Sequence, residues 1–354
     1  MKRLFLTLLV VAVAGSIFVI AGRVLFADPR ASESPASESV ANLSVVQDAG
    51  SVVIEEWPVP WEDSRPRDPY VGPEGRVWFV GQRADYLATL DAASGEFQRF
   101  ELDPGTGPHN LIVGGDGTVW YAGNRAAHIG RFDPATGEIH KIPMPDPAAR
   151  DPHTLTFDPA GDIWFSVQGG NFVGHLDVET EAVRLAAVPT ADSRPYGIVV
   201  DDEGTPWFTE FGSHKIGAVD PSTMEIREIV LPRPEARPRR LAVIDSGVWY
   251  VDHAAGYLGR IDPASGAVEE WAVPGGSEAR PYAMTADDSG RLWFVESGPS
   301  PNRLVGFDPA AKEFFSISEI PSGGGTVRHM VYHAPARAIW FGTDTNTIGR
   351  AQLP

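Results

Sequence analysis

Cysteine is absent from the 354-residue chain. Its absence excludes disulfide bonds, thiolate metal ligands, a cysteine nucleophile and a lipid-modified cysteine. The sequence also lacks the short motifs of several enzyme classes, since it has no G-x-S-x-G elbow, Walker loop, HExxH motif or EF-hand loop. Nothing in it indicates nucleotide or haem binding.

Positive charge is also scarce. The chain has 29 lysines and arginines against 47 aspartates and glutamates, which gives a formal net charge of −18. An acidic surface repels the phosphates of nucleic acids and anionic lipid headgroups. We therefore expect no nucleic-acid partner.

Only the N-terminus has a long apolar run. Lys2 and Arg3 precede an apolar stretch over residues 4–22, and a segment rich in Ser, Ala, Glu and Pro follows. We interpret residues 1–27 as a signal peptide or, by preference, a membrane anchor, and residues 28–50 as a flexible linker. The basic residues should stay in the cytoplasm, so we expect the remainder to be exported, either anchored to the membrane or periplasmic or extracellular.

A repeat is the strongest signal in the remaining sequence. Tryptophan followed by an aromatic residue recurs every 42 to 47 residues, at Trp78, Trp120, Trp164, Trp207, Trp249, Trp293 and Trp340. The clearest unit reads as four short strands, PYGIVVD (195–201), PWFTEF (206–211), KIGAVD (215–220) and EIREIVLP (225–232). Four strands per unit of this length is typical of a β-propeller. We predict an all-β, seven-bladed propeller over residues 51–354, with the tryptophans packed between blades.

The ends of this repeat predict how the ring closes. The seventh unit stops after its third strand, whereas the segment SVVIEEWPVP (51–60) stands alone before the first unit. It matches the fourth strand GAVEEWAVP (266–274) of another unit. We expect residues 51–60 to complete the last blade and so remove an exposed sheet edge.

Polar residues recur at two places in the units. Strands one and two of a blade are antiparallel, so the start of one and the end of the other meet at the same end of the channel. Strand one opens with Tyr70, His109, His153, Tyr196, Arg239, Tyr282 and His329. Strand two ends with carboxylates at Glu210, Asp252, Glu296 and Asp344. We expect these groups to converge in a funnel, although each histidine could simply bond a loop and each carboxylate could pair with a rim arginine.

The repeat resembles the streptogramin B lyases, the virginiamycin B lyase family. The resemblance covers all seven units and is closest at WFTE (207–210), KIG (215–217) and WFVE (293–296). It implies a carbon–oxygen lyase that opens a cyclic depsipeptide at its ester by elimination, with Mg²⁺ polarising the carbonyl and a histidine taking the proton.

The family's active residues carry over only in part. His329 stands where the resemblance places the base, and Asp344 stands where it places a glutamate. Val327 replaces a second glutamate, and Tyr282 replaces a histidine. Loss of a carboxylate weakens a hard-cation site, so the resemblance leaves enzymatic activity open.

Three functions remain open after this comparison. The first is a lyase-like enzyme with His329 as catalytic base and a divalent cation, Mg²⁺ or Ca²⁺, held by carboxylates among Asp344, Glu296, Asp252 and Glu210. The second is a lactonase-like metal hydrolase, and the third is a non-catalytic binding propeller of the cell envelope. In each case we expect a monomer that takes a small molecule or cyclic peptide in its funnel. Its predicted substrate contacts are Tyr282, His109, His153, Tyr196 and Arg239.

Overall fold

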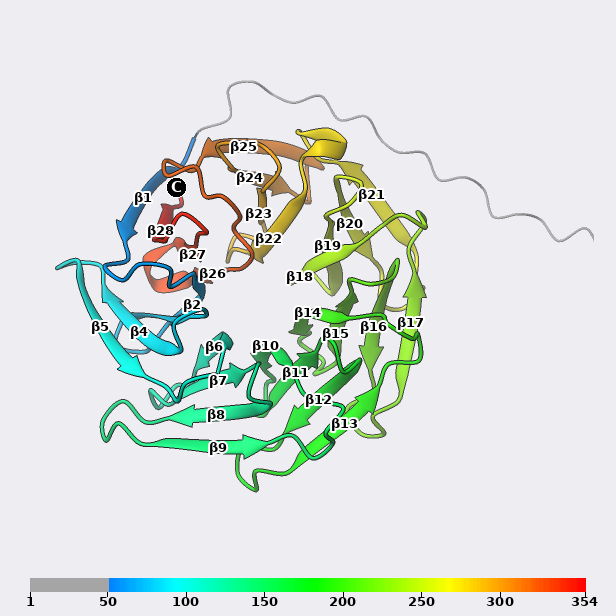
Figure 1. Cartoon of the computed structure of the whole chain (residues 1–354). Helices are drawn as coiled ribbons and strands as arrows, with labels where there is room; N and C mark the ends of the chain where they lie inside the picture. The colour runs from blue at the N-terminus through cyan, green and yellow to red at the C-terminus, as the bar shows by residue number, and fades with distance from the viewer. Residues whose placement is uncertain (1–50) are drawn as a thin grey trace, which may run out of the picture. The chain divides into compact units, whose positions relative to one another are not determined.

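The computed structural model describes residues 51–354, which form seven four-stranded antiparallel sheets arranged as blades around a central axis (Figure 1). Each innermost strand contacts the innermost strands of the two neighbouring blades, and the first and last blades also touch, so the ring is closed. The predicted seven-bladed, all-β propeller is confirmed.

The strands fall into four concentric sets. The innermost are β2 (Pro66–Val71), β6 (Pro108–Val113), β10 (Pro152–Phe157), β14 (Pro195–Val200), β18 (Pro238–Ile244), β22 (Pro281–Ala286) and β26 (Met330–His333). The second set is β3 (Val77–Gly81), β7 (Val119–Gly123), β11 (Ile163–Val167), β15 (Pro206–Glu210), β19 (Gly247–Asp252), β23 (Leu292–Glu296) and β27 (Ala338–Gly342). The third set is β4 (Tyr86–Asp91), β8 (His128–Phe132), β12 (Phe172–Leu176), β16 (Lys215–Val219), β20 (Tyr257–Ile261), β24 (Arg303–Asp308) and β28 (Thr347–Gln352). The outermost are β5 (Glu96–Glu101), β9 (Ile139–Pro143), β13 (Val183–Ala187), β17 (Ile226–Val230), β21 (Val268–Ala272), β25 (Glu313–Glu319) and β1 (Val53–Pro58). Two short 3₁₀ helices, η1 (Gly276–Glu278) and η2 (Ala334–Ala336), lie in connections.

Strand β1 closes the ring as predicted. It pairs antiparallel with β28 and becomes the outermost strand of blade seven, beside the C-terminus (Figure 1). Trp57 packs against Trp340 with ring centroids 5.6 Å apart, and Glu56 accepts a hydrogen bond from Thr347 Oγ1 at 2.6 Å. Sequence-distant ends of the domain are therefore held in one sheet.

The repeated tryptophans belong to the core, and their neighbours explain the repeat. All seven lie on the second strand of a blade, and none is more than 4% exposed. In blade four the indole N–H of Trp207 donates to Asp201 in the preceding turn at 2.8 Å. The ring of Phe208 packs over the third strand, where a Cβ on Gly217 would lie 2.1 Å from it. Only glycine fits there, which explains the KIG motif physically.

Each innermost strand except β26 carries a register shift near its start. In blade three, Pro152 pairs with Val167 and Leu155 with Phe165, so His153 and Thr154 together face one residue, Ser166. Ser166 Oγ accepts from the backbone N–H of Thr154 at 3.3 Å, which satisfies a donor that the bulge removes from the ladder. The bulge therefore brings two consecutive side chains toward the axis in one blade.

The predicted anchor (1–27) and linker (28–50) lie outside the described residues. Within residues 51–354, no helix is long and apolar enough to cross a membrane.

Candidate functional site

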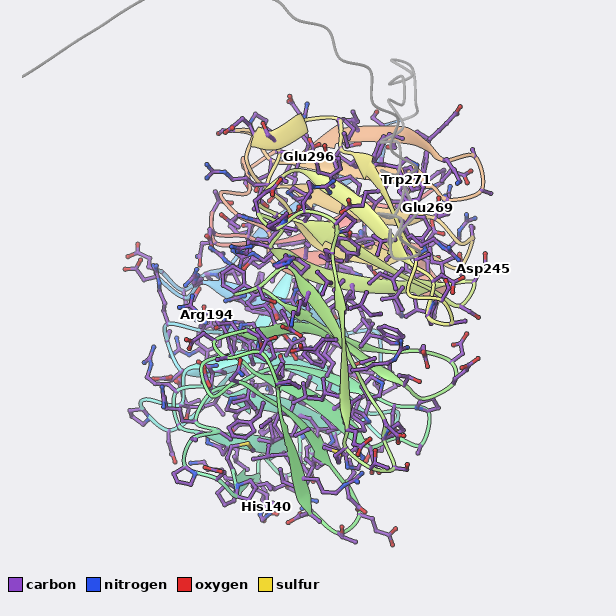
Figure 2. All side chains as sticks on the ribbon, turned by 90° about the vertical axis from the view of Figure 1, so that its right-hand side faces the viewer. His140, Arg194, Asp245, Glu269, Trp271 and Glu296 are labelled. Atoms are coloured by element: carbon purple, nitrogen blue, oxygen red, sulfur yellow. The ribbon has the colours of Figure 1, made fainter. Side chains whose placement is uncertain are left out.

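The register of the inner strands defines two rings of side chains around the axis. We call the end of the channel where the inner strands begin its upper end; in the side view Arg194, just before β14, lies at that face, and Asp245, just after β18, at the other (Figure 2). The upper ring holds the first residue of each bulge or its register equivalent: Arg67, His109, His153, Tyr196, Arg239, Tyr282 and Arg328. The lower ring holds the next residue: Asp68, Asn110, Thr154, Gly197, Arg240, Ala283 and His329.

The upper ring brings together the five residues predicted to contact substrate. Ring centroids are 3.6 Å apart for His109 and His153, 4.3 Å for His153 and Tyr196, and 6.0 Å for Tyr196 and Tyr282. The hydroxyls of Tyr196 and Tyr282, from blades four and six, share a hydrogen bond of 2.6 Å. The Arg239 guanidinium lies 4.9 Å from the Tyr282 ring centre. Four of the five are buried, and Arg239 is partly exposed.

The lower ring is a buried ionic network that crosses the channel. Asp68 Oδ2 accepts from Asn110 Nδ2 at 3.1 Å and from Arg240 Nη2 at 3.4 Å. Arg240 also donates to Thr154 Oγ1 at 3.1 Å and to the carbonyl of Arg328 at 2.9 Å. Burial opposes ionisation of Asp68, but the positive charges of Arg67 and Arg240, together with the hydrogen bond from Asn110, outweigh it and hold the pKa of this carboxyl well below its usual range. The network ties together side chains or backbone of blades one, two, three, five and seven.

Two of the predicted strand openings are displaced from the upper ring. Tyr70 pairs with Trp78, which is the register that Thr156 has opposite Trp164 in blade three. Tyr70 therefore lies deeper in the channel than expected, and Arg67 occupies the upper-ring position of blade one. In blade seven the pairing of Met330 with Phe341 places Arg328 in the upper ring. His329 is therefore one residue deeper than the histidines of blades two and three. The prediction that His329 opens its strand like them is wrong in register.

His329 has little basicity in this position. Burial is the main reason that its pKa falls to about 4, and the nearby Asp68 only partly offsets that effect. Its Nδ1 is buried without a hydrogen-bond partner in the described chain. His329 and Thr154 also line a cavity of about 470 Å³ whose other walls include Leu241 and Met284. A catalytic role for His329 stays a prediction, and at neutral pH its imidazole is uncharged.

The four predicted metal ligands do not form one group. Three of them end strand two as expected, but each bonds within its own surroundings. Glu296 Oε1 accepts from Gly275 N at 2.7 Å and Oε2 from Arg303 Nε at 2.9 Å; Asp252 Oδ1 accepts from Arg237 N at 2.8 Å; and Glu210 Oε2 accepts from Ser213 Oγ at 2.9 Å. Asp344 Oδ1 accepts from Arg328 Nη1 and lies 3.4 Å from Arg65 Nε.

These residues do not fit a divalent cation in this arrangement. Two guanidinium groups beside Asp344 repel a cation, and Val327 offers no ligand in place of the family's second glutamate. Within residues 51–354, Asp158, Asp162 and His175 are the only clustered group with potential ligand atoms this close together. Their oxygens already accept backbone and Trp164 indole N–H groups of the blade-three turn, so the group has a structural role.

Glu210 provides a test of these electrostatics. Burial is the main reason that its pKa rises to about 7, so the folded chain favours the protonated acid. Ionising it costs stability as the pH rises from about 4.5, the unfolded value, to about 7, and the cost is constant above that. Glu210→Gln should therefore gain stability relative to wild type by on the order of 1–2 kcal/mol between pH 5 and pH 8, after allowance for solvent screening. Urea unfolding at the two pH values measures this, and parallel pH dependences would contradict it.

The fold and these rings define a seven-bladed propeller whose axial channel is lined by two consecutive residues from every blade. The sequence profile of the virginiamycin B lyase family matches residues 38–261 and 206–351. The chain therefore belongs to the virginiamycin B lyase family. No curated protein sequence matches it.

Solved structures give the same picture. Virginiamycin B lyase from Staphylococcus aureus is 26% identical with a TM-score of 0.77, and the match covers 86% of this chain and all of that one. A catalytically inactive histidine variant of the same lyase, with quinupristin, is equally similar at 26% and a TM-score of 0.76, with the same coverage. A Kuenenia stuttgartiensis hydrazine synthase structure, at 15% identity and a TM-score of 0.66 over 83% of this chain and 97% of that one, shares the fold alone.

Sequence reasoning missed the charged half of the site, namely Arg67, Asp68, Arg240 and Arg328. One signal could have found most of it. A proline opens six of the seven inner strands, and the two residues that follow it are the ring members. The inner strand of blade one has two prolines, Pro66 and Pro69, and Tyr70 follows the second; the inner strand of blade seven has none.

Proposed function

We propose that this chain is a ligand-binding propeller that takes a small molecule or cyclic peptide at the upper end of its channel, without metal-dependent elimination. The observation that carries the proposal is the pair Arg328 and Asp344. An arginine stands in the upper ring of blade seven, bonded to the carboxylate that would have to bind the cation. The aromatic and histidine side chains of the upper ring support binding of such a ligand even without the elimination reaction.

Export belongs to the same proposal. The basic residues and apolar run before residue 28 support a propeller displayed outside the cytoplasm, where it would meet such ligands.

Metal-assisted opening of a cyclic ester is the second candidate function. Membership of the family supports it, as does the likeness to lyase structures over their whole length. It would require Asp344 to exchange its arginine partners for a cation.

Quinupristin, a cyclic depsipeptide, tests both candidates, because the structure of a similar protein contains it. We expect saturable binding by calorimetry, with at least tenfold weaker affinity in Tyr282→Ala, because that variant removes a ring and a hydroxyl from the upper ring. Mass spectrometry should show intact ligand with or without Mg²⁺. His140→Ala is the matched control, since His140 lies on the outer strand β9, away from the axis (Figure 2).

Three outcomes would contradict the proposal. A ring-opened product with a dehydro residue that forms only with Mg²⁺ would favour the lyase, and a hydrolysed ester would favour the lactonase. Equal binding by Tyr282→Ala and wild type would remove the upper ring as the site.

A further inference from the structure

The upper end of the channel has the opposite charge to the protein as a whole. The chain carries a net charge of −18, yet five arginines and only two aspartates occupy the two rings and their immediate ion pairs: Arg65, Arg67, Arg239, Arg240, Arg328, Asp68 and Asp344. Asp68 pairs with Arg240, and Asp344 pairs with Arg328. Three arginines are therefore in excess of the carboxylates: Arg65, which lies 3.4 Å from the shared Asp344, Arg67, which lies 3.5 Å from the shared Asp68, and Arg239.

Arg239 has no ion-pair partner in the described chain. Its guanidinium packs against aromatic rings, 3.5 Å from the centre of Phe211 and 5.5 Å from that of Tyr196, and its Nε is buried without a hydrogen-bond partner. Aromatic rings that hold a guanidinium by its face leave the N–H groups at its edge free to donate. Arg239 is therefore fixed in position by contacts that do not use its donors.

Arg67 has donors to spare as well. It is 5% exposed, and its Nη1 donates to Gln82 Oε1 at 3.2 Å and contacts His109 Nε2 at 2.8 Å. Its Nε and Nη2 are buried without a hydrogen-bond partner in residues 51–354, and Asp68 Oδ1 lies 3.5 Å from Nε, beyond good hydrogen-bond distance. Leaving the N–H donors of a buried cation without hydrogen bonds costs folding free energy, so an acceptor that binds beside Arg67 would be stabilising.

The two arginines face the same pair of tyrosines. Tyr196 and Tyr282 share their short hydrogen bond, and both Arg67 and Arg239 act electrostatically on each of them. Burial alone would raise the pKa of Tyr196, but Arg67 and Arg240 lower it. The local potential thus already favours a negative charge on an oxygen at this place.

We propose that the upper ring binds an oxyanion, a carboxylate or phosphate group of the ligand, through Arg67 and Arg239. This inference rests on the proposed ligand-binding function and gives the ligand its chemical class, which is anionic. A guanidinium presents two parallel N–H groups that match two oxygens of either group, and donors on both sides would satisfy the groups now left without partners.

Inorganic phosphate and acetate are the probes, compared by calorimetry with the full chain at constant ionic strength. We expect saturable binding of at least one of them to wild type, and the stronger anion reveals whether a phosphate or a carboxylate fits. Arg239→Gln should weaken binding at least tenfold. The anion affinity of Arg239→Lys, which keeps the charge but not the paired donors, should lie between those of wild type and Arg239→Gln.

Arg194→Gln is the matched control. Arg194 is exposed at the same face (Figure 2) and its side chain has no hydrogen bond or ion pair within the described chain, so the variant makes the same charge change outside the ring. It should bind the anions as wild type does. Loss of binding in both glutamine variants would mean diffuse surface attraction and would overturn the proposal, as would unchanged binding in Arg239→Gln or no binding in wild type.

Competition between these anions and the depsipeptide, measured by the same calorimetry, separates this inference from the proposed function. If the depsipeptide binds the upper ring while phosphate and acetate neither bind nor compete, the oxyanion site fails and ligand binding stands. If the anions bind as expected but no organic ligand does, the anionic site stands and the larger ligand is of another kind.

Discussion

A chain that begins at residue 62 should unfold far more easily than one that begins at residue 45. The shorter chain lacks β1, so β28 becomes an exposed edge with unpaired backbone groups. It also loses the buried Val52 and Val59 and the packing of Trp57 on Trp340. We expect a loss of roughly 5 kcal/mol or more, from apolar burial and unmade hydrogen bonds together.

Thermal unfolding of the two chains measures this loss. Val53→Ala in the longer chain is the control, because Val53 is 67% exposed in the same strand and its truncation should change stability by no more than about 0.5 kcal/mol. Equal melting temperatures for the chains that begin at 45 and 62 would mean that β1 contributes nothing to closure.

Asp68→Ala is expected to destabilise the propeller by about 3–5 kcal/mol, the usual cost of breaking a buried ion pair. The change leaves Arg240 and Arg67, both buried, without their carboxylate, and it frees Asn110 Nδ2. Because the pKa of Asp68 is lowered in the folded chain, its stabilisation is present above the unfolded value near 4 and is lost as the pH falls below it. Wild type should therefore lose more stability than the variant on acidification.

Two further variants make the Asp68 result specific. Asp344→Ala breaks an ion pair in which the aspartate side chain is 29% exposed, so it should cost no more than about 1 kcal/mol. The double variant Asp68→Ala with Arg240→Met should lose less than the two single changes together, because the unpaired charge is removed as well. Strict additivity in urea unfolding would show that Asp68 and Arg240 do not interact.

The fold was predictable because its signal repeats. A tryptophan every 42 to 47 residues reports one buried position seven times, and the shared EEW of residues 51–60 and 266–274 identified the closing strand. The site was predictable where proline marks the strand start, as for His109, His153, Tyr196, Arg239 and Tyr282.

The rest of the site depends on which way each side chain points at the end of its strand, and the sequence does not give that direction. Glu210, Asp252 and Glu296 end their strands at the predicted place, opposite Pro195, Pro238 and Pro281. Their partners are connecting loops and strands rather than one another, because a strand end has several nearby N–H donors that a carboxylate can reach. The inner strand of blade seven also lacks the opening proline that marks the other six, which is why His329 was placed one residue too close to the upper end.

None of the seven upper-ring residues belongs to a hydrophobic cluster of the blades. Substitutions at these positions therefore leave the apolar clusters of the blades unchanged, so descendants of one ancestral gene can acquire new ligand preferences through seven codons on an inherited architecture. For protein engineering, the same separation means that a combinatorial library confined to the upper ring would vary recognition without altering those clusters.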